Sequence, residues 1–277
     1  MLNPQTTLRT RIRNGETLAG IFVSELRTAN YGPILDAAAC DFAVFDLEHC
    51  PFSMTDLSNM FPSFRGSRVQ PMVRVPSANR EYIQPLLDLG VRGIMVPMVE
   101  SPEDVRAALD AMKYPPHGHR GIHFGTPHTL FQGVDRDTYA KVADDNILLV
   151  IQIETAKGLA NLDAILAEPG IDIAFVGNAD LASSLRVPND LNEGAALHTD
   201  MRRILRAAQA RGIASGGNFL DPKYAGQFYD DGLRFIMVCD EGNALISGLR
   251  GKMEGVRAKL PSAAKIQSIA PASASTC

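Results

Sequence analysis

Six polar side chains that could carry chemistry lie where short apolar runs of the sequence end. They are Asp46, His49, Arg74, Gln152, Glu154 and Asp180. If those runs are parallel strands of one barrel, their carboxyl ends meet at a single mouth and these residues face one another. Each residue taken alone is more often a helix cap or an ion-pair partner. Their shared placement at one end of successive runs favours a catalytic site, because surface ion pairs have no reason to prefer that end.

Two of these residues, Glu154 and Asp180, offer carboxylate oxygens without any cysteine nearby in the sequence. Buried carboxylates on neighbouring strand ends repel each other unless a cation joins them. Such ligands favour Mg²⁺ or Mn²⁺, with Co²⁺ as a third candidate, over structural zinc, and they leave positions open for a chelating 2-oxo acid. Arg74 could stabilise an oxyanion, and His49 could transfer protons near neutral pH.

The elements that would position these residues alternate, with a β-type run followed by a helical pattern eight times over. The predicted strands are Gly20–Val23, Phe42–Asp46, Gln70–Val75, Gly93–Val99, Leu148–Glu154, Ile173–Gly177, Ile213–Asn218 and Phe235–Cys239. The predicted helices are Tyr31–Ala39, Ser53–Met60, Arg80–Leu89, Pro102–Met112, Lys157–Leu166, Ala195–Arg211, Pro222–Asp230 and Glu241–Leu260. We therefore predict an α/β protein, a single-domain (β/α)8 TIM barrel over residues 1–260, ahead of an open doubly wound sheet.

Composition and motifs exclude several other classes. The 277 residues are 45% hydrophobic, carry a net charge of −4 and contain no basic block interleaved with aromatic residues, so we expect no nucleic-acid partner. The longest apolar run, Ile147–Ile151, is far shorter than the roughly 20 residues that span a bilayer, and no signal-peptide core is present. We expect a cytoplasmic protein. No Rossmann or P-loop glycine motif occurs, and the four cysteines suggest neither disulfides nor zinc.

Several strings of the sequence carry a resemblance to a known family. They are FDLEHCP, PMVRVP, LDLGVRGIMVPMVES, YPPHGHRG, IQIETAKGLANLDAIL and DIAFVGNADLA. Over about residues 8–258 the chain resembles the HpcH/HpaI aldolases, the metal-dependent class II pyruvate aldolases. The resemblance implies that the enzyme cleaves and forms 4-hydroxy-2-oxo acids, giving pyruvate or a close analogue plus an aldehyde through a metal-bound enolate.

The resemblance also implies roles for individual residues. Glu154 and Asp180 would bind the metal, and Arg74 would support the enolate oxygen. His49 would form an acid/base pair with Asp46. Four residues would lie at the bound keto acid: Gln152, Gly177, Asn178 and Ala179. The segment Gly177–Ala182 reads G-N-A-D-L-A where the family commonly has G-P-A-D-L-S, which puts its carboxylate-binding hydroxyl in doubt.

The connection between Lys113 and Asn146 is long for a barrel and rich in proline, glycine and histidine, so we expect it to cover the site. Its four histidines lack a carboxylate or cysteine that would complete a zinc site. We expect His123 and Phe124 to contribute to the aldehyde side of the pocket. The tail, residues 261–277, is small and polar, and we expect it to be disordered.

Alternatives remain open at this point. The enzymatic one is another pyruvate-enolate lyase or decarboxylase of the same superfamily, acting on oxaloacetate or a CoA thioester. The non-enzymatic one is a binding or scaffold barrel. Schiff-base catalysis is disfavoured because no lysine lies in a predicted strand, Lys157 being the nearest to a strand end. The resemblance further implies a homo-oligomer, a hexamer or trimer, and we expect Glu241–Leu260 to hold it as a packed or swapped C-terminal helix.

Overall fold

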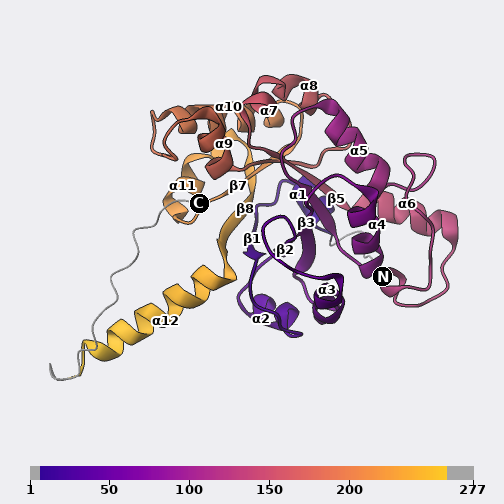
Figure 1. Ribbon diagram of the computed structural model, residues 1–277, viewed down its shortest axis with the longest axis horizontal. Coiled ribbons are helices and arrows are strands. Elements are labelled where there is room, and N and C mark those ends of the chain that lie inside the picture. Colours follow the sequence, from indigo (N-terminus) through magenta and orange to yellow (C-terminus); the bar gives the residue numbers. More distant parts are fainter. Residues whose placement is uncertain (1–6, 261–277) are drawn as a thin grey trace.

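The computed structural model describes residues 7–260, so the predicted disorder of 261–277 lies outside the described residues. Eight parallel strands close into a barrel in sequence order (Figure 1). The strands are β1 (Leu18–Val23), β2 (Phe42–Asp46), β3 (Gln70–Arg74), β4 (Gly93–Val96), β5 (Leu148–Ile153), β6 (Ile173–Val176), β7 (Ala214–Asn218) and β8 (Leu233–Asp240). The (β/α)8 barrel predicted from the sequence is confirmed, while the assignment of residues 1–260 to one domain stays a prediction.

The helices surround this barrel. They are α1 (Leu8–Arg13), α2 (Tyr31–Ala37), α3 (Met54–Met60), α4 (Arg80–Leu89), α5 (Pro102–Met112), α6 (Arg136–Asn146), α7 (Ala156–Ala160), α8 (Leu162–Leu166), α9 (Asn178–Leu185), α10 (Ala196–Gln209), α11 (Pro222–Gln227) and α12 (Glu241–Arg257). Short 3₁₀ turns lie at Phe61–Phe64, Pro127–Thr129 and Tyr229–Asp231. Capping boxes at Ser53 and Ser101 begin α3 and α5, because each serine hydroxyl accepts the N–H of the aspartate three residues later.

Three features of the helices differ from the sequence-based expectation. The sequence predicts a loop after Lys113, but this connection contains α6. Asp135 caps the amino-terminal end of α6, because its side chain accepts the N–H of Thr138. The helix predicted over Lys157–Leu166 is interrupted at Asn161, where the side-chain amide instead donates to the carbonyl of Glu100 at 2.8 Å. The barrel also gains α1 and α9, both too short to give a clear periodic pattern.

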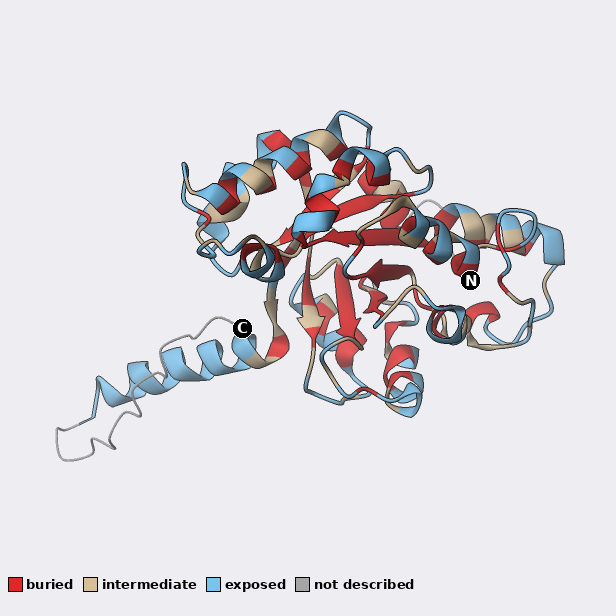
Figure 2. Cartoon of the chain, turned by 45° about the horizontal axis from the view of Figure 1, so that its top comes forward, coloured by how far each residue is buried: buried red, intermediate tan, exposed pale blue. Residues whose placement is uncertain are grey.

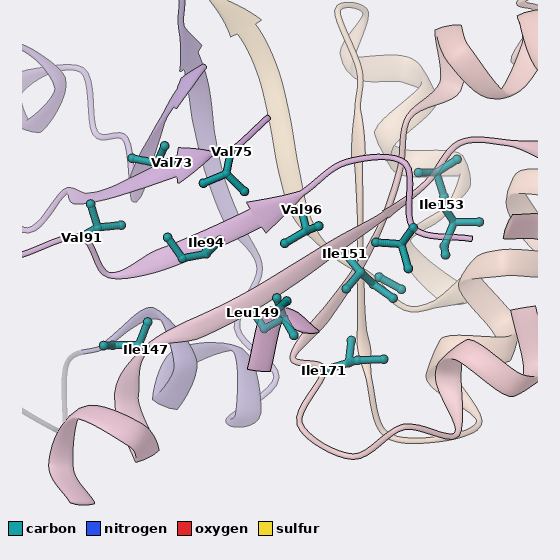
Figure 3. Packing of buried hydrophobic residues seen from close by; sticks show 14 of the residues in the cluster. Val73, Val75, Val91, Ile94, Val96, Ile147, Leu149, Ile151, Ile153 and Ile171 are labelled. Atoms are coloured by element: carbon teal, nitrogen blue, oxygen red, sulfur yellow. The ribbon is translucent and has the colours of Figure 1, made fainter. Parts of the chain in front are cut away.

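Two apolar layers hold the barrel together. Inside it, Phe42 and Phe235 stack with their centroids 3.8 Å apart, and small residues make room for such rings. A Cβ added at Gly216, for example, would lie 2.7 Å from Phe175. Outside it, alternate residues of the strands belong to a second buried cluster, among them Val73, Ile94 and Ile151, which Figure 3 labels. The strands are accordingly buried nearly throughout, while the outer faces of the helices are exposed (Figure 2).

Helix α1 closes the amino-terminal end of the barrel. Its Leu8 and Ile12 join the interior cluster, and its Arg9 Nε donates to Asp172 Oδ1 at 2.6 Å with both side chains buried. The other carboxylate oxygen of Asp172 accepts the Leu149 N–H at 3.0 Å. This end is therefore sealed by apolar side chains and a satisfied ion pair, which leaves the carboxyl ends of the strands as the open mouth.

Helix α12 leaves the barrel and projects away from it (Figure 1). The carboxylate of Glu241 anchors its first turn by accepting the backbone N–H groups of Ser24, Glu25 and Leu26. Beyond Glu241 the described helix contains no buried residue, and five large apolar side chains on it are about half exposed: Leu245, Ile246, Leu249, Met253 and Val256. No helix among residues 7–260 is long and apolar enough to cross a membrane.

The buried pair at the closed end gives a stability prediction. Replacing Asp172 with alanine leaves the buried Arg9 guanidinium without a carboxylate partner and with only the Asp144 carbonyl as acceptor among the described residues, so we expect a loss of about 3 kcal/mol in the free energy of unfolding. Asp163 is the matched control, because its ion pair with Arg211 is exposed and Asp163→Ala should cost less than about 1 kcal/mol. Urea unfolding measures both. Equal stability of the two variants would contradict the role given to Asp172.

Candidate active site

The polar residues at the mouth continue the inward-facing positions of the strands. Successive residues of a strand point to opposite faces, so every second residue points into the barrel. On β2 the interior residues Phe42 and Val44 are followed by Asp46, and on β3 Met72 is followed by Arg74. On β5, Leu148 and Val150 are followed by Gln152 and then Glu154. The same alternation that builds the core thus aims these side chains into the mouth.

Asp46 and Arg74 form a buried two-point ion pair. The two residues are partners in the β2–β3 register, and Arg74 Nε and Nη2 donate to Asp46 Oδ1 and Oδ2 at 2.9 and 2.7 Å. Burial works to raise the pKa of Asp46, but the hydrogen bonds and charge of Arg74 outweigh it and hold that pKa below its usual value. The guanidinium also lies over the ring of Phe22, 4.7 Å from its centroid. Arg74 is therefore fixed in orientation.

Glu48 is a site residue that the sequence reasoning did not select. Its carboxylate lies 3.2 Å from Arg74 Nη1 and 3.5 Å from the imidazole of His49. Burial raises the pKa of Glu48, and the charges of Asp46 and Asp180 raise it as well. Arg74 and His49 work in the opposite direction and lower it. The sequence could have indicated Glu48, because it follows Asp46 by two residues and residues at that spacing along a strand face the same side. Arg74 thus holds two carboxylates rather than one.

The imidazole of His49 is mostly exposed at the mouth, and its Nε2 lies 3.5 Å from Glu48 Oε2. Asp46 reaches His49 only through the backbone, accepting the Glu48 N–H at 3.0 Å and the His49 N–H at 3.4 Å. Within residues 7–260 no contact joins the two side chains, so the acid/base pair of His49 with Asp46 stays a prediction.

Glu154 is 2% exposed, and two donors fix its carboxylate. Oε1 accepts the Met98 N–H at 2.7 Å, and Oε2 accepts from the Gln152 amide at 2.9 Å. Met98 adopts a left-handed φ of 53°, which is uncommon for a residue other than glycine and aims its N–H at the carboxylate. The pKa of Glu154 is raised to about 7, mainly by burial and also by the nearby charges of Glu48 and Asp180, while the Met98 N–H and Arg74 work to lower it.

Gly177 makes room for Glu154, because a Cβ there would lie 2.0 Å from Glu154 Oε2. Asp180, in the first turn of α9, is exposed and has no ion pair or side-chain hydrogen bond within residues 7–260. The atoms here that could bind a metal are all oxygens. Glu154 and Asp180 repel each other when both are ionised, and the buried Oε1 of Gln152 has no hydrogen-bond partner among the described residues. These residues fit a divalent cation that Glu154 and Asp180 would hold.

The described residues contain no group of three or more His, Cys, Asp or Glu side chains that could hold a metal. A cation bound by two carboxylates would therefore complete its coordination with water or substrate oxygens. No lysine lies in any of the eight strands, and Lys157 Nζ instead pairs with Glu100 at 3.0 Å on an exposed surface.

Within the described part of the chain, the remaining residues selected from the sequence have their contacts with other parts of the protein and not with the carboxylates of Glu154 and Asp180. Asn178 and Ala179 open α9 and are half-buried, with the Asn178 amide donating to Asn189 Oδ1 at 3.2 Å. His123 is exposed. The ring of Phe124 packs within its own connection, with centroids 5.3 to 6.2 Å from those of its three ring neighbours, Tyr114, His128 and Tyr139. A contribution of His123 or Phe124 to an aldehyde pocket stays a prediction.

Comparison with known proteins adds to this geometry. Residues 19–248 match the family model described as HpcH/HpaI aldolase/citrate lyase. The chain is 35% identical over 229 residues to 2-keto-3-deoxy-L-rhamnonate aldolase of Klebsiella pneumoniae, covering 81% of this chain and 83% of that protein. It is 32% identical over 256 residues to hydroxypyruvate/pyruvate aldolase of Paraburkholderia phytofirmans, covering 90% and 97%.

Among solved structures, the HpcH/HpaI aldolase of Desulfitobacterium hafniense superposes with a TM-score of 0.86 at 25% identity, covering 92% of this chain and 98% of that chain. The family model spans all of β2 to β8, most of β1 and about half of α12, and so includes every residue of the mouth described above. The chain therefore belongs to the HpcH/HpaI aldolase/citrate lyase family of carbon–carbon lyases.

Proposed function

We propose that the protein is a class II aldolase that cleaves 4-hydroxy-2-oxo acids to pyruvate, or a close analogue, and an aldehyde, and catalyses the reverse addition. The observation that carries the proposal is the arrangement of Glu154 and Asp180 beside Arg74 at the barrel mouth, in a chain whose relatives include 2-keto-3-deoxy acid and pyruvate aldolases. Anionic oxygens of a 2-oxo acid and of its enolate need a cationic surrounding, which Arg74 and a cation held by Glu154 and Asp180 would supply.

Proteins of this family are generally dependent on a divalent metal. In this chain Glu154 and Asp180 would hold Mg²⁺, Mn²⁺ or Co²⁺, and a bound cation would polarise the 2-oxo group and stabilise negative charge on its oxygen. Gln152 and the turn Gly177–Ala179 would contact the keto acid and its carboxylate. The support for these assignments is the unpartnered oxygen of Gln152 and the space above Gly177.

In the cleavage step His49 would take the proton of the C4 hydroxyl, directly or through water. The C3–C4 bond then breaks, its electron pair forms the enolate of pyruvate, and the aldehyde leaves. Arg74 would support the enolate oxygen, and Glu48 would stabilise the imidazolium that forms, since it lies 3.5 Å from the ring. Asp46 would act by fixing Arg74 and, through backbone N–H groups, the segment that carries His49.

We further propose that the protein is a cytoplasmic homo-oligomer, a trimer or hexamer, that uses α12 as a contact. The support is the row of half-exposed apolar side chains on a helix that leaves its own barrel.

The direct test is pyruvate release from a panel of 2-keto-3-deoxy acids, coupled to lactate dehydrogenase, with Mg²⁺, Mn²⁺ and Co²⁺. We expect turnover that chelation stops and added metal restores, and that borohydride with pyruvate leaves unaffected. Turnover of oxaloacetate with release of CO₂ and no aldol cleavage would instead support the decarboxylase alternative. Absence of any metal-dependent turnover of 2-oxo acids would favour a non-enzymatic barrel.

The metal ligands can be tested separately from activity. Glu154→Ala and Asp180→Ala each remove one of two protein ligands, so we expect at least a 1000-fold loss of kcat together with loss of bound metal after dialysis. Glu103→Ala, at an exposed carboxylate on α5, should retain both. Metal content by elemental analysis decides the point, and full stoichiometric metal in either site variant would refute the ligand role.

His49 should be separable from the keto-acid end of the site. We expect His49→Ala to retain metal and to exchange the C3 protons of pyruvate with solvent, while aldol cleavage falls at least 100-fold, because the imidazole acts on the C4 hydroxyl. Proton NMR in D₂O follows the exchange. If the variant loses exchange and metal together with cleavage, His49 is not the C4 base.

A further inference from the structure

The last residue of β7, Asn218, places an unpartnered amide at the barrel mouth. Its side-chain Oδ1 is buried, and no described residue hydrogen-bonds to it. A buried polar atom without a partner costs about 1–3 kcal/mol, so such atoms in a folded protein call for an explanation. Within residues 7–260 only seven buried side-chain atoms are in this position, and two of them, on Gln152 and Asn218, belong to residues of the mouth.

The direction of the Asn218 side chain follows from the alternation of β7. An ideal Cβ at Gly216 would meet Phe175 and Phe235, two members of the interior cluster, so position 216 faces into the barrel. A Cβ at Gly217 would instead meet Phe219, which belongs to the outer cluster. Asn218 lies two residues beyond Gly216 and therefore faces inward again, above the apolar layer.

The register places Asn218 across Gly177 from Glu154. Strand β6 lies between β5 and β7, and its Val176 pairs with Ile153 on one side and with Gly217 on the other. The next residues along the three strands are Glu154, Gly177 and Asn218. Because Gly177 has no side chain, nothing from β6 separates the carboxylate from the amide at this level.

The chemistry of the two halves of the mouth differs. The half formed by β2, β3 and β5 carries the charged groups Asp46, Arg74 and Glu154, where Arg74 and a cation held by Glu154 would attract the anionic keto acid. Asn218 carries no charge and can both accept from and donate to a hydroxyl group, which an alkyl group cannot match. An amide in this position therefore discriminates between a hydroxyl and a methyl group.

We propose that Asn218 is a specificity-determining residue whose amide hydrogen-bonds a hydroxyl group on the aldehyde-derived part of the substrate. The inference rests on the aldolase function proposed above. A site that hydrogen-bonds a substrate hydroxyl rejects the analogue that lacks it, because its own polar groups are then left unpaired. Asn218 accordingly favours hydroxyaldehydes over alkyl aldehydes of the same size.

The test compares aldol addition of pyruvate to glycolaldehyde and to propanal, which differ by a hydroxyl in place of a methyl group. Asn218→Leu keeps the approximate shape of the side chain and removes the amide. We expect the ratio of kcat/KM for glycolaldehyde to that for propanal to fall at least tenfold relative to the wild type. Dividing variant by wild type cancels the different intrinsic reactivities of the two aldehydes. Asn14→Leu, at an exposed asparagine on the closed end, should leave the ratio unchanged.

Exchange of the C3 protons of pyruvate separates this inference from the function on which it rests. Asn218→Leu should still exchange these protons, because Arg74, Gln152 and Glu154 at the keto-acid end are retained. A wild-type enzyme that adds neither aldehyde overturns the aldolase proposal and this inference with it. An unchanged aldehyde ratio in an active Asn218→Leu variant overturns the inference alone and assigns the amide to bound water. Should that variant not fold, Asn218→Ala, which cannot overpack the mouth, is subject to the same two criteria.

Discussion

The rest of the site depends on the ion pairs that the buried guanidinium of Arg74 forms with the carboxylates of Asp46 and Glu48. A guanidinium in a barrel interior is stable only if several acceptors surround it, and the β2–β3 register supplies one directly opposite. The same pair orders the segment after β2, because Asp46 also accepts backbone N–H groups from Glu48 and His49. Loss of Asp46 would thus disturb both Arg74, the proposed anion-binding group, and the segment that carries His49, the proposed proton carrier.

Charge is not balanced at this mouth by the protein alone. Asp46, Glu48, Glu154 and Asp180 face a single arginine. Burial raises the pKa values of Glu48 and Glu154, and the charges of the neighbouring carboxylates raise them as well. At the closed end a buried carboxylate is neutralised within the protein, since Asp172 pairs with Arg9 and accepts the N–H of Leu149. Glu154 has two neutral donors and no direct ion pair within residues 7–260, and under the proposed function a bound cation would stabilise its charged form.

The barrel was predictable because its signals are local and repeated: apolar runs of strand length, each followed by a helical period. Asp46, Arg74, Gln152 and Glu154 were predictable from the same alternation, since each follows core residues at a spacing of two. Glu48 and Asn218 also follow inward-facing residues at a spacing of two. They were not selected from the sequence, because Glu48 lies beyond the predicted strand and Asn218 is the last residue of one. The packing of Phe124 could not be read at all, since its neighbours Tyr114 and Tyr139 are brought together only by the folding of the connection and α6.

The small residues of the mouth explain why its two halves can act on one molecule. Gly177 is held between strands that carry Glu154 and Asn218, and any side chain there would collide with the carboxylate. A substrate that spans the gap would place its 2-oxo acid against Glu154 and Arg74 and extend its hydroxylated end toward Asn218. The bond to be broken would then lie between the groups that would hold the metal and the keto acid and an amide that can bind a hydroxyl. The cation that Glu154 and Asp180 would hold, together with Arg74, would stabilise the enolate on one side of that bond, and the uncharged aldehyde would leave on the other.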